Sequence, residues 1–401
     1  TSSGRRMSAS MRGATASGTV SLNAANNIRL LSKGLTVSAV SGIALSGYVE
    51  SKTLATLTTS ATASNVAASN ASNIFSAGVT ATSGGIGSIN LKGTGNTELK
   101  AISAGTGGAT IEVAGSVTST SAFTSQGAVS ITTPLGSDGN IDLTGAFSVA
   151  GNVTLSADKP GFIRINNITR DTVFNTVTGG GAITLTSAAN AITLGVSAQA
   201  LTGQGGDAGQ ASGLVSISAT AVTIATSIVT QGGNVSITST SGAVTASTGA
   251  NITTTAIANT GTTSGSVTVA GAGGVTLNNV TTTGAANDVA DGSNAATVSI
   301  SSSGGNVSVG TITTSGGQPQ RQRGVEIPAR ADPRPRPPPA SRRLLMGQKP
   351  RRPRQRRGHT QGMGIGAVDG VKDVARHAFG PDLSRQGTPP PKPQQARSRT
   401  G

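Results

Sequence analysis

The sequence predicts an all-β protein that folds as a repetitive β-solenoid and ends in a disordered C-terminal tail. A short strand-like phrase recurs along most of the chain, usually after Gly or Gly-Asn. The composition includes 57 Gly but only 6 Phe, one Tyr and no Trp, too few large side chains for the thick core of a compact globule. Charge and Pro content change abruptly near Gly317, where we place the end of the solenoid.

Each phrase has two β-branched or aliphatic residues that flank one polar residue. This period of two predicts a short strand with one buried face. Gly or Asn at the edge of a phrase supplies the positive φ that a sharp corner requires. Clear examples are Val129/Ile131, Ile141/Leu143, Val153/Leu155, Ile183/Leu185, Val215/Ile217, Val235/Ile237, Val267/Val269, Val298/Ile300 and Val307/Val309.

The phrases form longer units of three short strands. Successive units begin at Ile183, Val215, Val235, Val267 and Val298, in steps of 32, 20, 32 and 31 residues. The third strand of the first two units is expected at Val196 and at Val229. Loops at Leu201–Gly213 and Gly284–Ala296 lengthen some units without removing strands. A solenoid tolerates such insertions, because a loop at one corner leaves the stack of coils intact.

The chain divides into three predicted segments: an irregular segment 1–17, a solenoid 18–317 and a tail 318–401. Weaker phrases such as Val20/Leu22 and Ile89/Leu91 extend the repeat toward the N-terminus. Between Lys52 and Gly85 the pattern fades, and we expect a long loop or irregular coils there.

The tail carries almost all of the positive charge. Residues 1–317 hold 11 Lys+Arg and 10 Asp+Glu, whereas residues 318–401 hold 19 and 5. Its Pro and like charges oppose compaction, so we expect disorder. Its composition is also that of GC-rich DNA read out of frame, which suggests a reading-frame error as its origin.

The phrases GGNVSITSTSGAVTAS at 232–247 and GSVTVAGAGGVTLNNVTTTG at 265–284 resemble filamentous haemagglutinin-type adhesins and the passengers of two-partner secretion. The resemblance covers about residues 18–317 and implies a right-handed parallel β-helix. It also implies export through an outer-membrane secretion pore and binding to host or neighbouring cells. The family's secretion domain carries Asn-Pro motifs, and this chain has no Asn-Pro dipeptide. We therefore expect that domain to be missing, which leaves the export route open.

Residues 1–317 contain no His and no Cys, which excludes His-based triads and His or Cys metal sites there. We therefore predict no enzyme activity, no catalytic, cofactor-binding or metal-binding residues, and no cofactor. Charge is densest at Asp158, Lys159, Arg164, Arg170 and Asp171, between Phe162 and Phe174. This stretch is either a carbohydrate or anion groove with an aromatic platform or, as we favour, an irregular coil with its charges in solvent.

Four further patterns are interpreted as structural. Asp288 and Asp291 lack the tandem repeat of a calcium site, and Gly362–Gly366 lacks the strand and Lys-Ser/Thr of a phosphate loop. Thr-rich segments at Thr253–Thr255, Thr281–Thr283 and Thr313–Thr314 do not predict ice binding, because we expect their register to drift. Asn residues before strands are expected at corners, where they could stack as amide ladders. They are Asn152, Asn167, Asn234, Asn251, Asn279 and Asn306.

The functional prediction is a fragment of a bacterial adhesin, secreted or on the cell surface in association with the outer membrane. It would act as a rigid rod for adhesion or display, with a host or neighbouring-cell receptor or glycan as partner and no small-molecule substrate. A first alternative is a polysaccharide-binding or polysaccharide-processing β-helix. That alternative needs a cleft with several of Asp138, Asp142, Asp158 and Asp171. A second is a rod whose basic tail binds nucleic acid.

Overall fold

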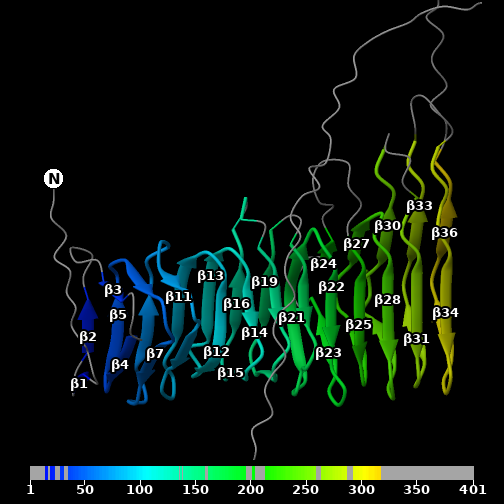
Figure 1. Cartoon of the computed structure of the whole chain (residues 1–401). Coiled ribbons are helices and arrows are strands. Elements are labelled where there is room, and N and C mark those ends of the chain that lie inside the picture. Colours follow the sequence, from blue (N-terminus) through cyan, green and yellow to red (C-terminus); the bar gives the residue numbers. More distant parts are fainter. Residues whose placement is uncertain are drawn as a thin grey trace, which may run out of the picture. The chain divides into compact units, whose positions relative to one another are not determined.

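A computed structural model describes residues 14–16, 19–22, 28–30, 35–134, 136–137, 139–158, 161–195, 201–203, 213–258, 263–286 and 292–317 (Figure 1). All regular elements of this part are β-strands, and it contains no helix that could span a membrane. The backbone divides into two units, Thr1–Arg330 and Ala331–Gly401, and every strand belongs to the first. The prediction of a disordered tail at 318–401 lies outside the described residues.

The strands stack into faces that run along the solenoid (Figure 1). The first sheet has 15 strands: β1 (Ala14–Ala16), β4 (Leu35–Ala39), β7 (Ala55–Thr59), β10 (Val79–Thr82), β12 (Thr97–Ala104), β14 (Val117–Ser119), β15 (Phe123–Ser125), β17 (Ile141–Leu143), β18 (Phe147–Val149), β20 (Ile163–Ile165), β22 (Ile183–Thr186), β25 (Val215–Ala219), β28 (Val235–Ser239), β31 (Val267–Gly271) and β34 (Val298–Ser302).

The second sheet begins with single strands and divides after β21. Its undivided part consists of β2 (Thr19–Leu22), β5 (Gly42–Leu45), β8 (Asn65–Ala68), β11 (Ile89–Thr94), β13 (Ala109–Ala114), β16 (Val129–Thr132), β19 (Val153–Ser156) and β21 (Thr172–Gly179). One branch consists of β23 (Ile192–Leu194), β26 (Val222–Ile224), β29 (Val244–Ala246), β32 (Val275–Leu277) and β35 (Val307–Val309). The other consists of β24 (Leu201–Gly203), β27 (Ile228–Gln231), β30 (Ile252–Thr255), β33 (Val280–Thr283) and β36 (Ile312–Ser315). A third, short sheet consists of β3 (Ile28–Leu30), β6 (Val49–Ser51) and β9 (Ile74–Phe75).

Neighbouring strands pair in parallel, one coil apart. The unit starts predicted from the phrases are confirmed residue by residue: Ile183 pairs with Val215, Val215 with Val235, Val235 with Val267, and Val267 with Val298. The described part is therefore an all-β parallel β-solenoid, as predicted. Adjacent coils place aliphatic residues over aliphatic residues at these inward positions, so one alternating pattern satisfies every coil.

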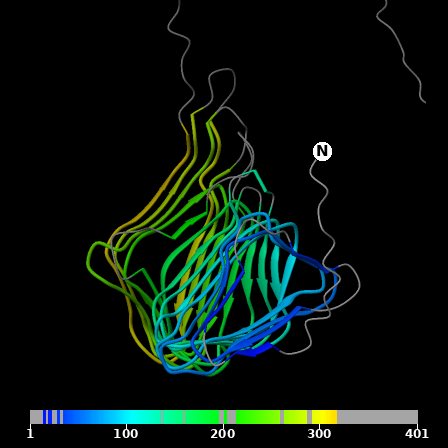
Figure 2. The same ribbon diagram turned by 90° about the vertical axis from the view of Figure 1, so that its left-hand side faces the viewer.

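The aliphatic residues of the phrases point inward and form one continuous core. Figure 2 views the solenoid end-on, from the side of β1, and shows the strands enclosing this interior. Ile217 and Val269, both assigned to the inward face from sequence, are 1% and 0% exposed. The larger buried side chains include Phe123 and Phe147, which lie on paired strands with ring centroids 5.4 Å apart. A narrow core of this kind needs stacked aliphatic residues rather than many aromatic ones.

The expectation of a loop or irregular coils between Lys52 and Gly85 is wrong. This segment contains β7, β8, β9 and β10, and β7 and β10 pair in parallel. Its inward positions include Ala55, Ala68 and Ala81, all fully buried. Ala carries no β-branched signal, so its alternation is hard to recognise until neighbouring coils supply the register.

The prediction for the third strand of the units needs two corrections. In the first unit this strand is β24, which occupies the start of the predicted loop Leu201–Gly213, and Val196 lies outside the described residues. In the next unit the buried residues are Ile228 and Thr230, while Val229 is half-buried and points outward. The prediction counted only aliphatic residues as buried and therefore assigned Val229 to the core. Because Thr230 is the inward residue, the predicted inward position was wrong by one residue.

That inward Thr closes the corner at which the loops leave the solenoid. Thr230, Thr254 and Thr282 are stacked and fully buried. Each Oγ1 donates a hydrogen bond to a carbonyl across the corner: to Gly233 at 2.6 Å, to Gly265 at 2.6 Å and to Ala296 at 3.0 Å. The acceptors lie 3, 11 and 14 residues farther along the chain. One bond thus closes corners of different length, which confirms that insertions here leave the stack intact.

Candidate binding face

One outward-facing row of polar side chains follows the first sheet from coil to coil. We call it the polar row, and each member pairs with the next across the parallel ladder. It consists of Glu98, Thr118, Asp142, Arg164, Thr184, Ser216, Ser236, Thr268 and Ser299. A second row two residues along the strands consists of Thr186, Ser218, Thr238, Ala270 and Ser301. Within each row, residues on neighbouring strands lie about 4.8 Å apart, so the two rows form a regular surface.

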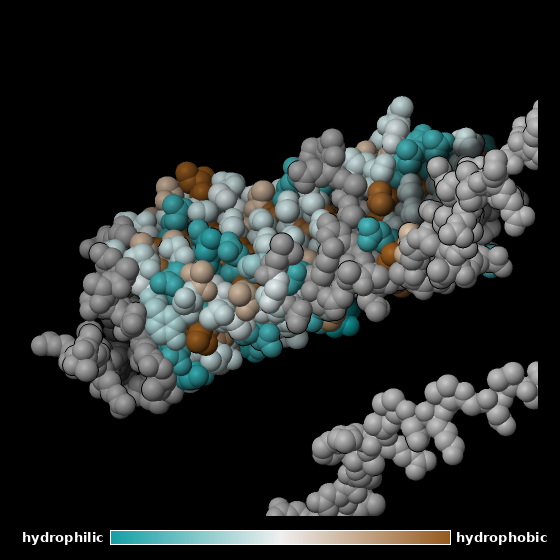
Figure 3. All heavy atoms as spheres, turned by 90° about the horizontal axis from the view of Figure 1, so that it is seen from above, coloured by the Kyte–Doolittle hydropathy of each residue, from teal (hydrophilic) through white to brown (hydrophobic). Residues whose placement is uncertain are grey.

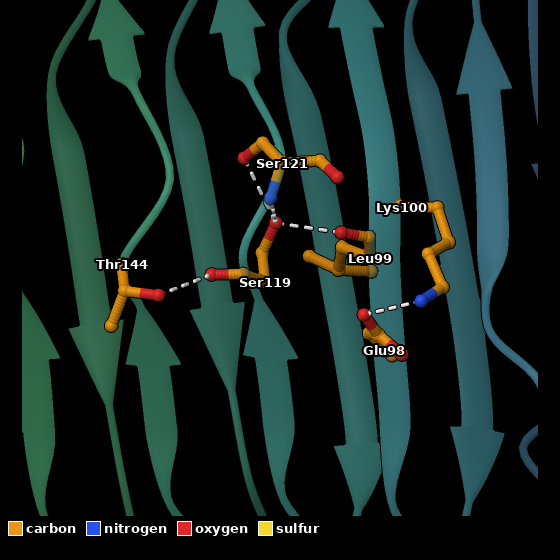
Figure 4. A network of polar contacts seen from close by, with 6 residues as sticks. All are labelled: Glu98, Leu99, Lys100, Ser119, Ser121 and Thr144. Atoms are coloured by element: carbon orange, nitrogen blue, oxygen red, sulfur yellow. Dashed lines mark hydrogen bonds and ion pairs between the residues drawn. The ribbon is translucent and has the colours of Figure 1, made fainter. Parts of the chain in front are cut away.

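The N-terminal half of the polar row is charged and paired. In Figure 4, Lys100 Nζ contacts Glu98 Oε1 at 2.6 Å. Farther along, Arg164 donates to both carboxylate oxygens of Asp142, from Nε at 2.8 Å and from Nη2 at 2.5 Å. These bonds and the charge of Asp142 raise the pKa of Arg164, so this side chain stays charged. The geometry fixes a guanidinium on the face at a position where sequence alone shows no partner.

Hydroxyl bonds tie the coils together beside these charges. Ser119 Oγ donates to the Leu99 carbonyl at 2.6 Å, and Thr144 Oγ1 donates to the Ser119 carbonyl at 3.3 Å (Figure 4). Ser119 is buried. The chain of bonds crosses three successive coils, and it therefore holds the charged part of the row in register.

The C-terminal half of the polar row is uncharged. Between Thr172 and Gly317 the charged residues are Asp207, Asp288 and Asp291, all outside the described residues. Ser216, Ser236 and Thr268 occupy outward positions between buried residues, where Ser216 and Ser236 are half-buried and Thr268 is exposed. Figure 3 shows the molecule from above the view of Figure 1, and the coloured surface on that side is mostly hydrophilic to intermediate, with scattered hydrophobic residues. This half offers hydroxyl donors and acceptors to an external partner without attracting either sign of charge.

The aromatic platform of the groove alternative is not formed. The favoured interpretation as an irregular coil with its charges in solvent is also wrong in part, because Ile163–Ile165 forms the paired strand β20 and Asp158 is buried. Phe174 is 1% exposed and belongs to the core. Phe162 is half-buried, and the guanidinium of Arg164 lies over its ring at 5.7 Å from the centroid. Arg170 is exposed, and Lys159 lies outside the described residues. One aromatic ring and one cation therefore share this site, in place of two rings on both sides of a groove.

The candidate carboxylates are each used locally. Asp142 binds Arg164 on the outer face, buried Asp158 accepts from the Ser137 amide at 2.8 Å, and Asp171 accepts from the Ala191 amide at 2.8 Å. Asp138 lies outside the described residues. Within the described ranges, no three His, Cys, Asp or Glu residues gather as a metal site. The arrangement gives no support to a paired-carboxylate mechanism.

The expectation of a drifting Thr register is wrong. Thr253, Thr281 and Thr313 pair in series, as do Thr254, Thr282 and Thr314. Another outward row consists of Thr193, Thr223, Thr245, Thr276 and Ser308. The register was missed because loops of different length separate these strands along the chain.

Asn residues lie at the corners as predicted, but their bonds differ from amide ladders. Asn234 Oδ1 accepts from the Ser266 amide at 2.8 Å, and Asn251 Oδ1 accepts from the Asn279 amide at 3.2 Å. Asn279 Oδ1 in turn accepts from the Thr311 amide at 3.2 Å. Each side chain thus caps a backbone donor of the next coil, which is cheaper than leaving that donor unpaired.

One buried acidic residue with polar partners was not recognised from sequence. Glu50 is buried, contacts Lys52 Nζ at 3.1 Å and accepts from the Tyr48 hydroxyl at 3.0 Å. The alternation Tyr-x-Glu-x-Lys was the available signal. The calcium hypothesis at Asp288 and Asp291, and the phosphate-loop hypothesis at Gly362–Gly366, fall outside the described residues.

The fold and these rows define the described part of the chain as a parallel β-solenoid with polar, regularly repeating outer faces. No protein family, curated protein or solved structure was found to match it.

Proposed function

We propose that the chain is a rod-shaped segment of a bacterial adhesin, secreted or displayed at the cell surface, that is not an enzyme. Its partner would be a receptor or glycan on a host or neighbouring cell. The observation that carries this proposal is the polar row, whose members stay in register through successive coils. A regular face distributes many weak contacts along the rod, and linked weak contacts add to useful avidity.

The face also favours a ligand that is neutral and rich in hydroxyl groups. Ser216, Ser236 and Thr268 present hydroxyl groups without charge, and Arg164 at the charged end supplies a planar donor over Phe162. Glycan hydroxyls pair well with such groups, so a cell-surface glycan is the partner we propose first. Export through an outer-membrane pore remains part of the proposal, on the strength of the resemblance to haemagglutinin-type adhesins.

Adhesion is tested with the full chain coupled to beads that are incubated with bacterial and host cells. The variant Ser216→Lys/Thr268→Lys puts charge on alternate coils of the polar row. The control variant Thr223→Lys/Thr276→Lys puts charge on alternate coils of the second sheet, on strands β26 and β32. We expect the first variant to weaken capture about tenfold and the second to leave it unchanged. Beads with the unaltered chain that capture no more cells than uncoated beads would refute the adhesion proposal.

A further inference from the structure

The last described coil ends in an open edge. Strands β34, β35 and β36 pair with β31, β32 and β33 on one side, and no described strand pairs with them on the other. Val307 and Ile312 are 47% and 49% exposed, whereas Val275 and Val280 one coil earlier are 1% and 0% exposed. An uncovered parallel edge with apolar side chains is a site of uncontrolled strand pairing, so a solenoid needs a cap there.

The backbone shows what kind of partner fits the first strand of this edge. In each coil the first inward amide donates to the carbonyl that precedes the first inward residue of the next coil. The series is Ile141 to Phe162 at 2.9 Å, Ile163 to Ala182 at 2.9 Å, Ile183 to Leu214 at 2.8 Å, Val215 to Asn234 at 2.8 Å, Val235 to Ser266 at 2.8 Å and Val267 to Thr297 at 3.0 Å. Val298 is the next donor in this series. By the same pattern, the acceptor for the Val298 amide is the carbonyl of the residue directly before another aliphatic–polar–aliphatic phrase.

Such a phrase follows in the chain at Val325-Glu326-Ile327, directly after Gly324. Earlier coils connect the end of one unit to the next through 3 residues (232–234), 11 residues (256–266) or 14 residues (284–297). From the end of β36 to Val325 there are 9 residues (316–324), within the same range. The connection therefore has the length that a further coil start requires.

The phrase also has the features of a terminal strand. Pro328 follows Ile327 at once and has no amide to donate to the Ile300 carbonyl of β34, so the pairing would end with Ile327. Glu326 takes the outward position, where a charge opposes further pairing. The residue two places before the first aliphatic residue is usually Gly, because a Cβ at Gly265 would lie 1.9 Å from the Gly233 carbonyl oxygen. The last described coil has Ala296 instead of Gly at this place, so a residue with a Cβ is already accepted there. Arg323 would take the same place before Val325.

We propose that Val325–Ile327 adds to β34 as a parallel strand and caps the first face of the solenoid. Val325 lies over Val298, Ile327 over Ile300, and the Gly324 carbonyl accepts from the Val298 amide. The cap prevents another chain from pairing with β34. It moves the end of the solenoid from Gly317 to Ile327, so the disorder expected for the tail would begin after this strand. The cap does not depend on the adhesion proposal.

Hydrogen exchange of single backbone amides in the full chain tests the cap within one molecule. We expect the Val298 amide to exchange at least about tenfold more slowly than those of Val307 and Ile312, whose strands gain no partner. The variant Val325→Asp/Ile327→Asp should remove this difference, and Leu344→Asp/Leu345→Asp in the same tail should preserve it. Equal exchange of all three amides in the unaltered chain would overturn the proposal, whether or not any variant folds.

Engineered cysteines give a second test, because the chain contains no Cys. Ser299 and Glu326 become lateral neighbours in the proposed register, at a separation that a disulfide spans. We expect Ser299→Cys/Glu326→Cys to form an intramolecular disulfide in mild oxidant. The control Ser308→Cys/Glu326→Cys, with its first cysteine on β35, should remain reduced. Similar yields in the two variants would contradict the register.

Discussion

At the scale of single residues, position on the inward or outward side of a strand decides what a substitution does. Neighbours along one strand alternate between a dry core and water, although they are often similar in size. Val269, for example, is fully buried, and the adjacent Thr268 is exposed. Polar residues are tolerated inside when their hydroxyl has an acceptor, as at Thr254.

A charge placed in the core is expected to unfold the rod locally or completely. Ile217→Asp or Val269→Asp should lower the free energy of unfolding by about 4 kcal/mol or more, because the carboxylate meets no partner. The outward control Thr268→Asp should stay within about 0.5 kcal/mol. Thermal and urea denaturation measure both effects, and an unchanged midpoint for Val269→Asp would show that the inward assignment is wrong.

The Arg164–Asp142 pair is expected to matter little for stability. Arg164 is largely exposed, so solvent screens the pair, and Arg164→Ala should cost less than about 1 kcal/mol. Because the pKa of Arg164 is raised in the folded protein, the stabilisation by this pair is fully present at any pH below the ordinary arginine pKa. It is lost only in strong alkali, when the pH rises through the raised pKa. Urea denaturation at neutral pH in low and high salt checks this. A large loss that salt does not reduce would contradict the surface assignment.

At the scale of elements, the corners rather than the strands set the spacing of coils in sequence. The third-strand corner accepts connections of different length, and a buried Thr hydroxyl closes each one. The strands on either side keep their register, because the ladder bonds do not depend on the loop. Insertions at this corner are therefore energetically cheap.

Removal of one closing hydroxyl should loosen its loop without unfolding the rod. Thr254→Val keeps the shape of the side chain but leaves the Gly265 carbonyl unpaired, at a cost of about 1–2 kcal/mol. Limited proteolysis should then cut within 256–264 faster than in the unaltered chain. The control Thr253→Val changes an outward residue of the same strand and should leave the cutting rate as it was.

A shortened corner should be accepted. Deletion of residues 256–263 joins Thr255 to Ser264, and Ser264→Gly supplies the freedom found at Gly232, where φ is 80°. The corner then matches the short one after β27, so we expect the strand content by circular dichroism to persist. We expect the stability to fall by less than about 3 kcal/mol, since one buried Ala is lost and the Ala296 amide loses the Ser264 hydroxyl as its acceptor. Loss of the strand signal would mean that the loop is needed for folding.

At the scale of the whole molecule, charge is strongly divided. The solenoid segment 18–317 is nearly neutral, and the segment 318–401 carries most of the positive charge. A neutral rod suits a partner recognised through hydroxyl groups, whereas a basic segment attracts polyanions.

Nucleic-acid binding, if it occurs, is expected to reside in the basic segment. Filter binding of the full chain to DNA across a salt series should then give a slope of about −0.9 per phosphate contact, and a chain ending at Gly317 should not bind. Equal binding by both chains would assign the contact to the rod.

The reading-frame hypothesis is tested on the gene itself. If the tail arose from a frame error, translation downstream of Gly317 in one of the other two frames should restore the Gly-x-Val-Ser/Thr-Ile phrase. A restored phrase would also remove Val325–Ile327 from the protein, and the cap with it. If neither frame restores the phrase, the basic segment is a genuine part of the chain.

The sequence by itself determined the class of fold, the length of the coils and the inward residues of the clear phrases. Val215, Val235 and Val267 were predictable as unit starts because β-branched alternation and Gly corners are local signals. The tertiary structure alone decided which residues become neighbours across coils. The Asp142–Arg164 pair, the register of Thr253 with Thr281 and the inward place of Thr230 all depend on stacking of segments 20 to 30 residues apart. Local patterns carry no information on that stacking, because loops of variable length separate the strands.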